Sequence, residues 1–218
     1  MLIARTSSPD ETRELGAAVA RAARAGDVVL LEGELGAGKT TFAQGFARGL
    51  GVPDTVTSPT FTLLRPYRCS VPGGLPESPR EGAAATEGAA ATNDAAAMDG
   101  AAAMDGAAAT DDRVRVLWHA DLYRMEEMRE VWDLGLDELL EDGGVALVEW
   151  GDRAPLAFGG GYLVVRLEVP QCALQHGGAA RPGSEERTVT FHAPPGGPWA
   201  ERSDNLRDLI ARWLGSRP

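Results

Sequence analysis

Residues 28–41 of the chain read VVLLEGELGAGKTT. The four apolar residues at 28–31 are typical of a strand that is buried on both faces. From Gly33 to Thr40 the sequence matches the pattern G-x-x-x-x-G-K-[ST] at every fixed position, and a helix-forming segment follows. A strand, a glycine-rich loop and a helix in this order predict a phosphate-binding loop.

The residue types in this loop suit phosphate chemistry. Glycines let successive backbone N–H groups converge on phosphate oxygens, and the N-terminus of the next helix adds partial positive charge. Lys39 places a charge near the β and γ phosphates, and the Thr40 hydroxyl can bind Mg²⁺. We therefore expect nucleotide binding by Gly33, Glu34, Leu35, Gly36, Ala37, Gly38, Lys39, Thr40 and Thr41, with Lys39 also acting in catalysis.

The choice of basic residues supports this interpretation. The chain contains 21 basic residues, and Lys39 is its only lysine, since all the others are arginine. Guanine recognition in the manner of GTPases needs an Asn/Thr-Lys-x-Asp motif, and no lysine remains to build one. ATP is therefore the expected nucleotide.

Two acidic residues are candidates for holding the metal or orienting a water molecule. Glu149 follows the apolar run 145–148, and Asp121 follows a similar run that begins at Val114. Ligands in α/β sheets bind at the carboxyl ends of the strands, where both residues are expected. The alternative for either is an acid that merely ends a strand in solvent. His119 is expected to pack or hydrogen-bond rather than act as a base.

Strands and helices alternate along most of the chain. A helix is expected from Ser8, which would cap it with Pro9 in the first position, and another at 39–50, closed by Gly51. Further strands are expected at 61–64, 114–118, 145–148, 162–169 and 187–192, and helices at 125–140, with a break near Gly135, and after a Ser203 cap. This order predicts an α/β fold of three layers, with a mixed, largely parallel central sheet and a more β-rich C-terminal portion.

The segment 71–112 interrupts this pattern. Between 81 and 112 it contains tandem repeats such as EGAAATEGAAAT, no Leu, Ile, Val or aromatic residue, and seven acidic but no basic residues. A segment with so little apolar surface is expected to be a disordered insertion in a surface loop of a single domain spanning 1–218. An acidic tether or interaction segment is the alternative.

The overall composition narrows the possible protein classes. The net charge is −11, which argues against broad binding to nucleic acid or anionic membranes, but seven of these charges belong to 81–112. Two cysteines provide neither a disulfide framework nor a metal-ligand set. No apolar run approaches the length of a membrane span, so a cytoplasmic protein is expected.

The order of the motifs resembles that of the TsaE family, bacterial ATPases of the pathway that makes threonylcarbamoyladenosine in tRNA. The motifs that carry the resemblance are the loop at 33–42, Ser58-Pro59-Thr60-Phe61, His119-Ala120-Asp121-Leu122-Tyr123-Arg124, and Glu149-Trp150. The resemblance covers about residues 3–70 and 114–152, roughly half of the chain. The insertion and the C-terminal third depart from the family pattern.

The resemblance implies a P-loop ATPase that binds ATP and Mg²⁺, hydrolyses ATP slowly, and works with TsaB and TsaD. Those partners transfer the threonylcarbamoyl group to the adenosine beside the anticodon of tRNAs that read A-starting codons. By resemblance, Thr40 and Glu149 hold Mg²⁺, Asp121 supports the metal or the water, and 58–60 form a switch-like loop. Ser7, Trp150 and Arg187 are further candidates for nucleotide contacts.

Two other functions remain open from the sequence. One is a small-molecule kinase, in which Arg124 and Arg129 would have to form a lid over the phosphates, although they read equally well as a solvated helix face. The other is a nucleotide-gated binding module in which hydrolysis is incidental.

Overall fold

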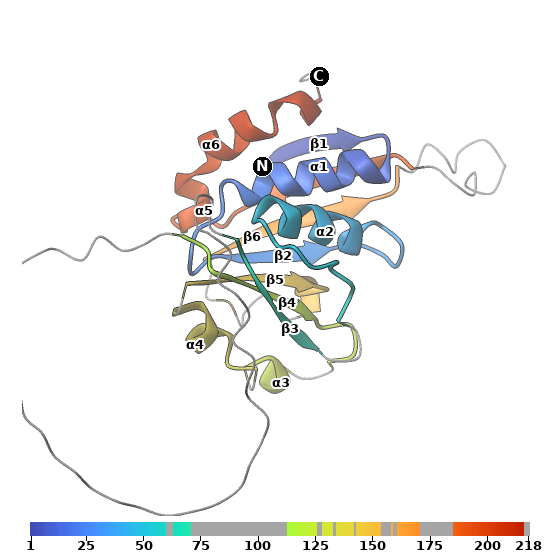
Figure 1. Ribbon diagram of the computed structural model, residues 1–218. Coiled ribbons are helices and arrows are strands. Elements are labelled where there is room, and N and C mark those ends of the chain that lie inside the picture. Colours follow the sequence, from blue (N-terminus) through green and yellow to red (C-terminus); the bar gives the residue numbers. More distant parts are fainter. Residues whose placement is uncertain are drawn as a thin grey trace, which may run out of the picture.

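The computed structural model describes residues 1–59, 63–70, 113–125, 128–132, 134–141, 143–153, 158, 161–170 and 185–215 (Figure 1). The insertion predicted at 71–112 lies outside these ranges. The strands are β1 (Leu2–Thr6), β2 (Val28–Glu32), β3 (Leu64–Arg68), β4 (Val116–Asp121), β5 (Gly144–Glu149), β6 (Tyr162–Glu168) and β7 (Arg187–His192). The helices are α1 (Pro9–Ala20), α2 (Lys39–Gly49), α3 (Met128–Trp132), α4 (Leu136–Glu141), α5 (Pro198–Glu201) and α6 (Ser203–Leu209), with short 3-10 turns η1 (Gly151–Arg153) and η4 (Ala211–Trp213). In this described part of the chain, no helix is long and apolar enough to cross a membrane.

All of these strands lie in one mixed sheet, in the order β1-β7-β6-β2-β5-β4-β3. The four central strands, β6, β2, β5 and β4, run parallel to one another, whereas β1, β7 and β3 pair antiparallel with their neighbours. The predicted α/β class with a mixed, largely parallel sheet is thus confirmed. In the register of β4 with β5, Asp121 is the partner of Glu149, so both candidate carboxylates lie at the carboxyl edge of the parallel sheet.

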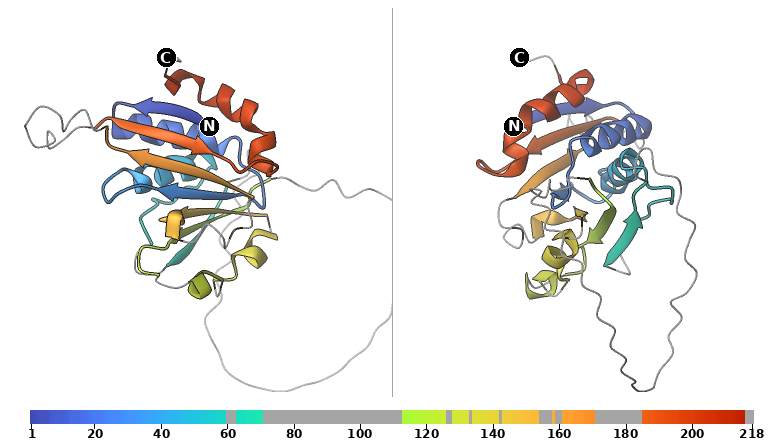
Figure 2. Two further views of the ribbon diagram at one scale, coloured as in Figure 1. Left: turned by 180° about the vertical axis from the view of Figure 1, so that it is seen from behind. Right: turned by 60° about the vertical axis from the view of Figure 1, so that its left-hand side comes forward.

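The central strands are buried on both faces, as their continuous apolar runs predict. Every residue of β2 and β5 is buried. Val29 and Leu31 of β2 pack into the core that contains α1 and α2, whereas Val28 and Leu30 pack into a second core beside α3 and α4. Helices therefore cover opposite faces of the sheet, which gives the three layers seen in Figure 2.

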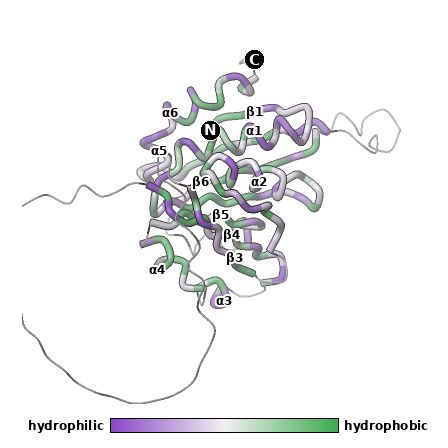
Figure 3. Tube along the Cα trace, viewed as in Figure 1, coloured by the Kyte–Doolittle hydropathy of each residue, from purple (hydrophilic) through white to green (hydrophobic). Residues whose placement is uncertain are grey.

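Helix boundaries follow the capping chemistry at α1 but not at α6. At α1 the backbone N–H of Glu11 donates to Ser8 Oγ (3.2 Å) and Pro9 is the first helical residue, so the predicted cap is confirmed. At α6 the predicted Ser203 cap is wrong, because Ser203 is already helical and Arg202 precedes the helix. The shorter helix α5 ends at Glu201, and its turn leads directly into α6. Figure 3 shows α6 with alternating hydrophobic and hydrophilic colouring, as expected for a helix with one face on the core.

The two outer strands at the N-terminus and after α2 differ from expectation. The sequence did not predict β1, and it predicted a strand at 61–64, of which only Leu64 lies in a strand while 60–62 lie outside the described residues. The strand β3 instead continues through Pro66 to Arg68. Proline has no N–H group and is tolerated only where a strand has a free edge. At the end of the sheet, β3 offers such an edge.

The strands β3 and β4 form a closed stem on either side of the insertion. Arg68 is the register partner of Val116, and the backbone N–H of Cys69 donates to the carbonyl of Arg115 (2.9 Å). One residue further, the N–H of Ser70 donates to Gly51 O (3.2 Å). The chain therefore leaves and rejoins the described structure at neighbouring points, at the amino end of β4.

The helices α1 and α2 lie side by side in Figure 1 and approach each other at glycines. A Cβ atom on Gly45 would lie 1.9 Å from the carbonyl oxygen of Arg13, and one on Gly16 would lie 2.4 Å from Phe42 O. In both cases the obstacle is backbone, which cannot rotate away. Larger residues at these positions would force the two helices apart.

We predict that Gly45→Ala lowers the free energy of unfolding by about 2 kcal/mol, because overpacking by one methyl costs about 1–3 kcal/mol and the gain in helix propensity only partly offsets it. Urea denaturation measures the change. Gly215→Ala is the control, since a Cβ there meets nothing within 4 Å. An unchanged or higher urea midpoint for Gly45→Ala would contradict the close approach of the helices.

Candidate functional site

The loop between β2 and α2 is shaped by three glycines with left-handed backbone. The φ angles of Gly33, Gly36 and Gly38 are 137°, 80° and 107°. A Cβ atom on Gly33 would also lie 2.3 Å from the carbonyl oxygen of Leu167, so only glycine fits. Gly38 is the N-cap of α2 and has no side chain to occupy the first N–H groups of the helix. These N–H groups and the helix dipole suit an anion.

Lys39 is the first residue of α2, and its side chain contacts the loop. The residue is 5% exposed. Its ammonium donates to the carbonyl oxygens of Gly33 (2.7 Å) and Glu34 (2.9 Å). Burial lowers the pKa of Lys39 from its ordinary value, and the carboxylates of Glu149, Asp121 and, to a smaller extent, Asp152 oppose that shift. The rest of the loop differs in exposure, with Ala37 buried and Leu35 largely exposed.

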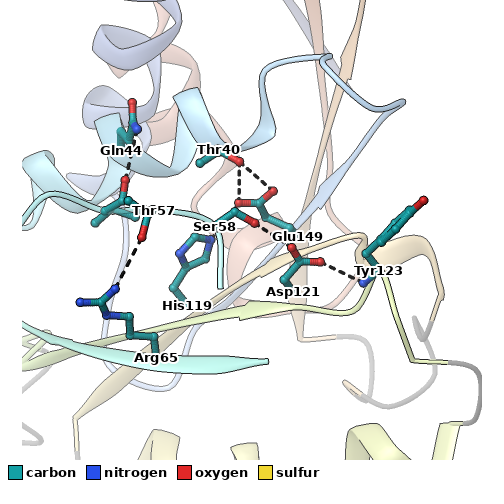
Figure 4. Close-up of polar contacts among 10 residues, drawn as sticks. Thr40, Gln44, Thr57, Ser58, Arg65, His119, Asp121, Tyr123 and Glu149 are labelled. Carbon is teal, nitrogen blue, oxygen red and sulfur yellow. Dashed lines mark hydrogen bonds and ion pairs between the residues drawn. The ribbon is translucent and has the colours of Figure 1, made fainter. Parts of the chain in front are cut away.

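The carboxylate of Glu149 connects the first turn of α2 with β4 (Figure 4). The Thr40 hydroxyl donates to both of its oxygens (3.0 and 3.1 Å), and His119 Nε2 lies 3.0 Å from Oε1. An ionised carboxylate can only accept, so His119 donates from Nε2. Within the described residues its Nδ1 has no hydrogen-bond partner. His119 is fully buried, and its predicted hydrogen bonding is confirmed by the contact with Glu149.

The carboxylate of Asp121 accepts hydrogen bonds from the segment that follows α2 and from the backbone two residues further along its own strand end. The Ser58 hydroxyl donates to Oδ2 (2.7 Å), and the backbone N–H of Tyr123 donates to Oδ1 (2.9 Å). Figure 4 shows the Asp121 and Glu149 carboxylates close together at the ends of β4 and β5. The structure therefore brings Lys39, Thr40, Asp121 and Glu149 to one place, as expected from the positions of Asp121 and Glu149 at strand ends.

The segment before Ser58 is fixed at two further points. Gln44 Nε2 of α2 donates to Val56 O (3.1 Å), and Arg65 of β3 contacts the Thr57 hydroxyl (3.5 Å). Both contacts are drawn in Figure 4. Thr60, the last residue of the switch-like loop inferred from the resemblance, lies outside the described residues. The segment 56–58 thus crosses from α2 to the end of β4, with the Ser58 hydroxyl directed at Asp121 and the Thr57 hydroxyl directed at Arg65.

Arg187, the first residue of β7, contacts the loop, whereas Ser7, directly after β1, contacts α1. Arg187 Nε donates to Ala37 O (2.8 Å), and its Nη2 lies 3.4 Å from Gly36 O. Its strand partner in β1 is Thr6, which immediately precedes Ser7. Ser7 donates from both its N–H and its hydroxyl to the Glu11 carboxylate (2.7 and 2.9 Å). Arg187 therefore contacts the carbonyls of the loop, whereas Ser7 is bonded to the first turn of α1, whose cap is Ser8.

Trp150 follows Glu149 and has a left-handed backbone with φ of 61°. The Lys39 ammonium lies 3.6 Å from the centroid of its ring. Tyr123 packs on the same indole with a centroid distance of 5.0 Å, and the Arg153 guanidinium lies 5.4 Å from Tyr123 and 5.9 Å from Trp150. Sequence reasoning did not single out Tyr123 or Arg153, since no spacing rule connects either of them with Lys39.

The oxygen atoms that the side chains offer at this place fit a nucleotide phosphate with Mg²⁺. Hydroxyl and carboxylate oxygens are hard ligands, and Mg²⁺ typically takes one or two carboxylates together with phosphates and water. Thr40, Glu149 and Asp121 offer such oxygens beside a lysine and a glycine-rich loop. Within the described ranges, no group of three or more His, Cys, Asp or Glu side chains is arranged to hold a metal ion.

Comparisons with a family model and with individual proteins all point to one family. A model of the family described as "Threonylcarbamoyl adenosine biosynthesis protein TsaE" matches residues 6–74 and 108–173. The tRNA threonylcarbamoyladenosine biosynthesis protein TsaE of Bacillus subtilis is 35% identical over 189 residues, covering 87% of this chain and 84% of that protein. The protein of the same name from Streptomyces coelicolor is 37% identical over 141 residues, covering 64% of this chain and 67% of its own length.

A solved structure shows the same arrangement. The crystal structure of Bacillus subtilis YdiB matches this chain with a TM-score of 0.54 and 29% sequence identity. The match covers 97% of this chain and 94% of the other. The mixed sheet and its helices are therefore shared with a structure of related sequence.

We predict that His119→Ala lowers the free energy of unfolding by about 2–4 kcal/mol, because it removes a donor from a buried carboxylate and leaves a cavity. Thermal or urea unfolding measures the loss. His192, which is exposed in β7, provides the matched control, and His192→Ala is expected to change stability by less than about 0.5 kcal/mol. Equal losses in the two variants would contradict the role of His119 in satisfying Glu149.

Proposed function

The chain belongs to the TsaE family, and on that premise we propose that it is the ATP-binding and slowly hydrolysing subunit of a system that forms threonylcarbamoyladenosine in tRNA. The observation that carries this proposal is the meeting of Lys39 and Thr40 of the phosphate-binding loop with Asp121 and Glu149 at the ends of two parallel strands. The names of the relatives support a role in this pathway, and the geometry of the site supports the binding of a nucleotide.

We assign the roles of the residues from their positions. Lys39 and the N–H groups of the loop bind the β and γ phosphates, and Thr40 and Glu149 hold Mg²⁺. Asp121 supports the metal or orients the attacking water. Arg187, through its bonds to Ala37 and Gly36, keeps the loop in shape.

The proposed partners are the TsaB and TsaD proteins, which would perform the acyl transfer while this subunit supplies the nucleotide-dependent step. The contact between Ser58 and Asp121 (2.7 Å) supports such a role. Metal or water that recruits Asp121 would compete with Ser58 for the same carboxylate, so the segment 56–58 would respond to the nucleotide. Segments of this kind transmit hydrolysis to partner surfaces.

The structure favours this function over a small-molecule kinase. A kinase would need arginines directed over the phosphates, but the side chains of Arg124 and Arg129 are both exposed. A nucleotide-gated module that does not depend on hydrolysis uses the same site, and only turnover measurements separate it from an ATPase.

We predict that Lys39→Ala weakens the binding of MgATP on the order of 100-fold, because it removes two charge-assisted hydrogen bonds worth about 1.5 kcal/mol each. Isothermal titration calorimetry gives the dissociation constant. Arg48→Ala is the control, since Arg48 is an exposed cation at the far end of the same helix and its loss leaves binding unchanged. Comparable affinity for Lys39→Ala and the parent protein would refute the assigned phosphate site.

The second prediction concerns turnover in the assembled system. We expect ATP hydrolysis by this protein to rise when the TsaB and TsaD proteins of the same organism are added, and tRNA modification to require all three. Asp121→Asn should reduce the turnover number at least tenfold while MgATP affinity changes less than threefold, because it acts on the metal or water. If neither complex formation nor stimulation is detected, and modification proceeds with Lys39→Ala, the proposed function is wrong.

A further inference from the structure

The indole of Trp150 lies against the functional group of the only lysine in the chain. The distance from Lys39 Nζ to the ring centroid is 3.6 Å, well within the range of a cation–π interaction. This contact is independent of the carbonyl bonds that Lys39 makes with Gly33 and Glu34. Lys39 is therefore contacted by loop backbone and by an aromatic face together.

The geometry leaves no free direction for a phosphate oxygen at the ammonium. Lysine has three N–H donors, and two of them are used by Gly33 O and Glu34 O. The indole covers the remaining face, and the side chain is 5% exposed. A phosphate that binds Lys39 must therefore take the place of the indole, of a carbonyl contact, or of both.

The ring is held in this position by more than Lys39. Trp150 adopts φ of 61°, a conformation that costs free energy for any residue except glycine. The next residue, Gly151, lies directly on β2, where an added Cβ would be 2.6 Å from the Cβ of Leu30. Tyr123 and Arg153 also pack on the indole. The surroundings thus force the backbone turn that directs the ring to the lysine.

We propose that Trp150 is a positioning residue that covers the phosphate-binding face of Lys39 and leaves it when a nucleotide phosphate binds. The inference rests on the proposed nucleotide site and adds to it a side chain that competes with the ligand. The Tyr123 and Arg153 contacts connect the ring to the surface, because both side chains are exposed. Displacement of the indole then changes the surface formed by these two residues.

The direct test follows the ring by ¹⁹F NMR. The full-length protein is labelled with 5-fluorotryptophan, which places one probe on each of its five tryptophans, and Trp150→Phe identifies the Trp150 signal. On titration with MgADP and MgATP, the Trp150 signal is expected to shift in proportion to occupancy. The Trp213 signal is the internal control, because that ring packs on Arg212 (3.8 Å) away from the loop and should not shift.

A variant shows whether the indole of Trp150 opposes or assists nucleotide binding. Trp150→Leu removes the aromatic face and should tighten MgADP binding up to about tenfold, since a desolvated cation–π contact that opposes binding is lost. Trp132→Leu makes the same chemical change at a ring that is 62% exposed and should leave the affinity unchanged. Weaker binding by Trp150→Leu would mean that the indole assists the phosphate, which overturns the proposal.

The outcomes separate this inference from the proposed function. If the parent protein binds MgADP in calorimetry but its Trp150 signal does not move, the displacement is refuted and the nucleotide site stands. If calorimetry detects no binding of either nucleotide, both the site and the displacement are refuted. A shifted Trp150 signal together with tighter binding by Trp150→Leu supports both.

Discussion

Two carboxylates buried side by side next to one ammonium determine how this site is built. Asp121 and Glu149 are register partners on neighbouring strands, each is 3% exposed, and Lys39 is the nearby cation. Buried charges of like sign repel one another and require hydrogen-bond donors or a counter-ion. The structure supplies Ser58, Thr40 and His119, each from a different segment. In the proposed function, a divalent cation bound beside the two carboxylates would relieve the excess negative charge.

This requirement also explains why distant parts of the chain depend on one another. Thr40 begins α2, Ser58 follows it, and His119 lies in β4, so a single pair of carboxylates joins the helix, the connecting segment and the sheet. Loss of any of these donors leaves a buried oxygen with fewer partners, at a cost of about 1–3 kcal/mol. In the proposed function, stability and chemistry therefore share the same residues, and substitutions that affect one are expected to affect the other.

The sequence alone predicts the centre of the molecule better than its borders. The parallel strands β2 and β5 carry continuous apolar runs, and Lys39 and Glu149 follow from a loop pattern and a strand end. The sequence does not indicate β1 because residue type does not follow burial there: Ile3 is exposed and Thr6 is buried, and the partner strand β7 lies at the other end of the chain. β3 was misplaced because Pro66 argues against a strand unless the edge position is known. The residue type of Ser203 suits a helix cap, but α5 ends at Glu201 and Arg202 takes the cap position of α6.

Within the site, the sequence does not predict which side chains contact one another. The resemblance to a family pointed to Ser58 and Trp150, but no pattern states that Trp150 turns its ring onto Lys39. That contact needs the left-handed backbone at Trp150, the close packing of Gly151 on Leu30 and the second aromatic ring of Tyr123. Such three-body arrangements depend on the folded structure and have no fixed spacing along the chain.

The paired stem of β3 and β4 keeps the point of insertion away from the candidate site. The residues that flank the segment 71–112 are bonded together at the amino end of β4, whereas Asp121 lies at its carboxyl end, about 16 Å away at the usual rise of a strand. The stem, rather than the segment itself, fixes where the chain re-enters the sheet. A change in the length of that segment therefore need not move Asp121 or the other residues of the candidate site. The stem makes this position tolerant of changes in length, and it offers a place to attach a probe or a second domain.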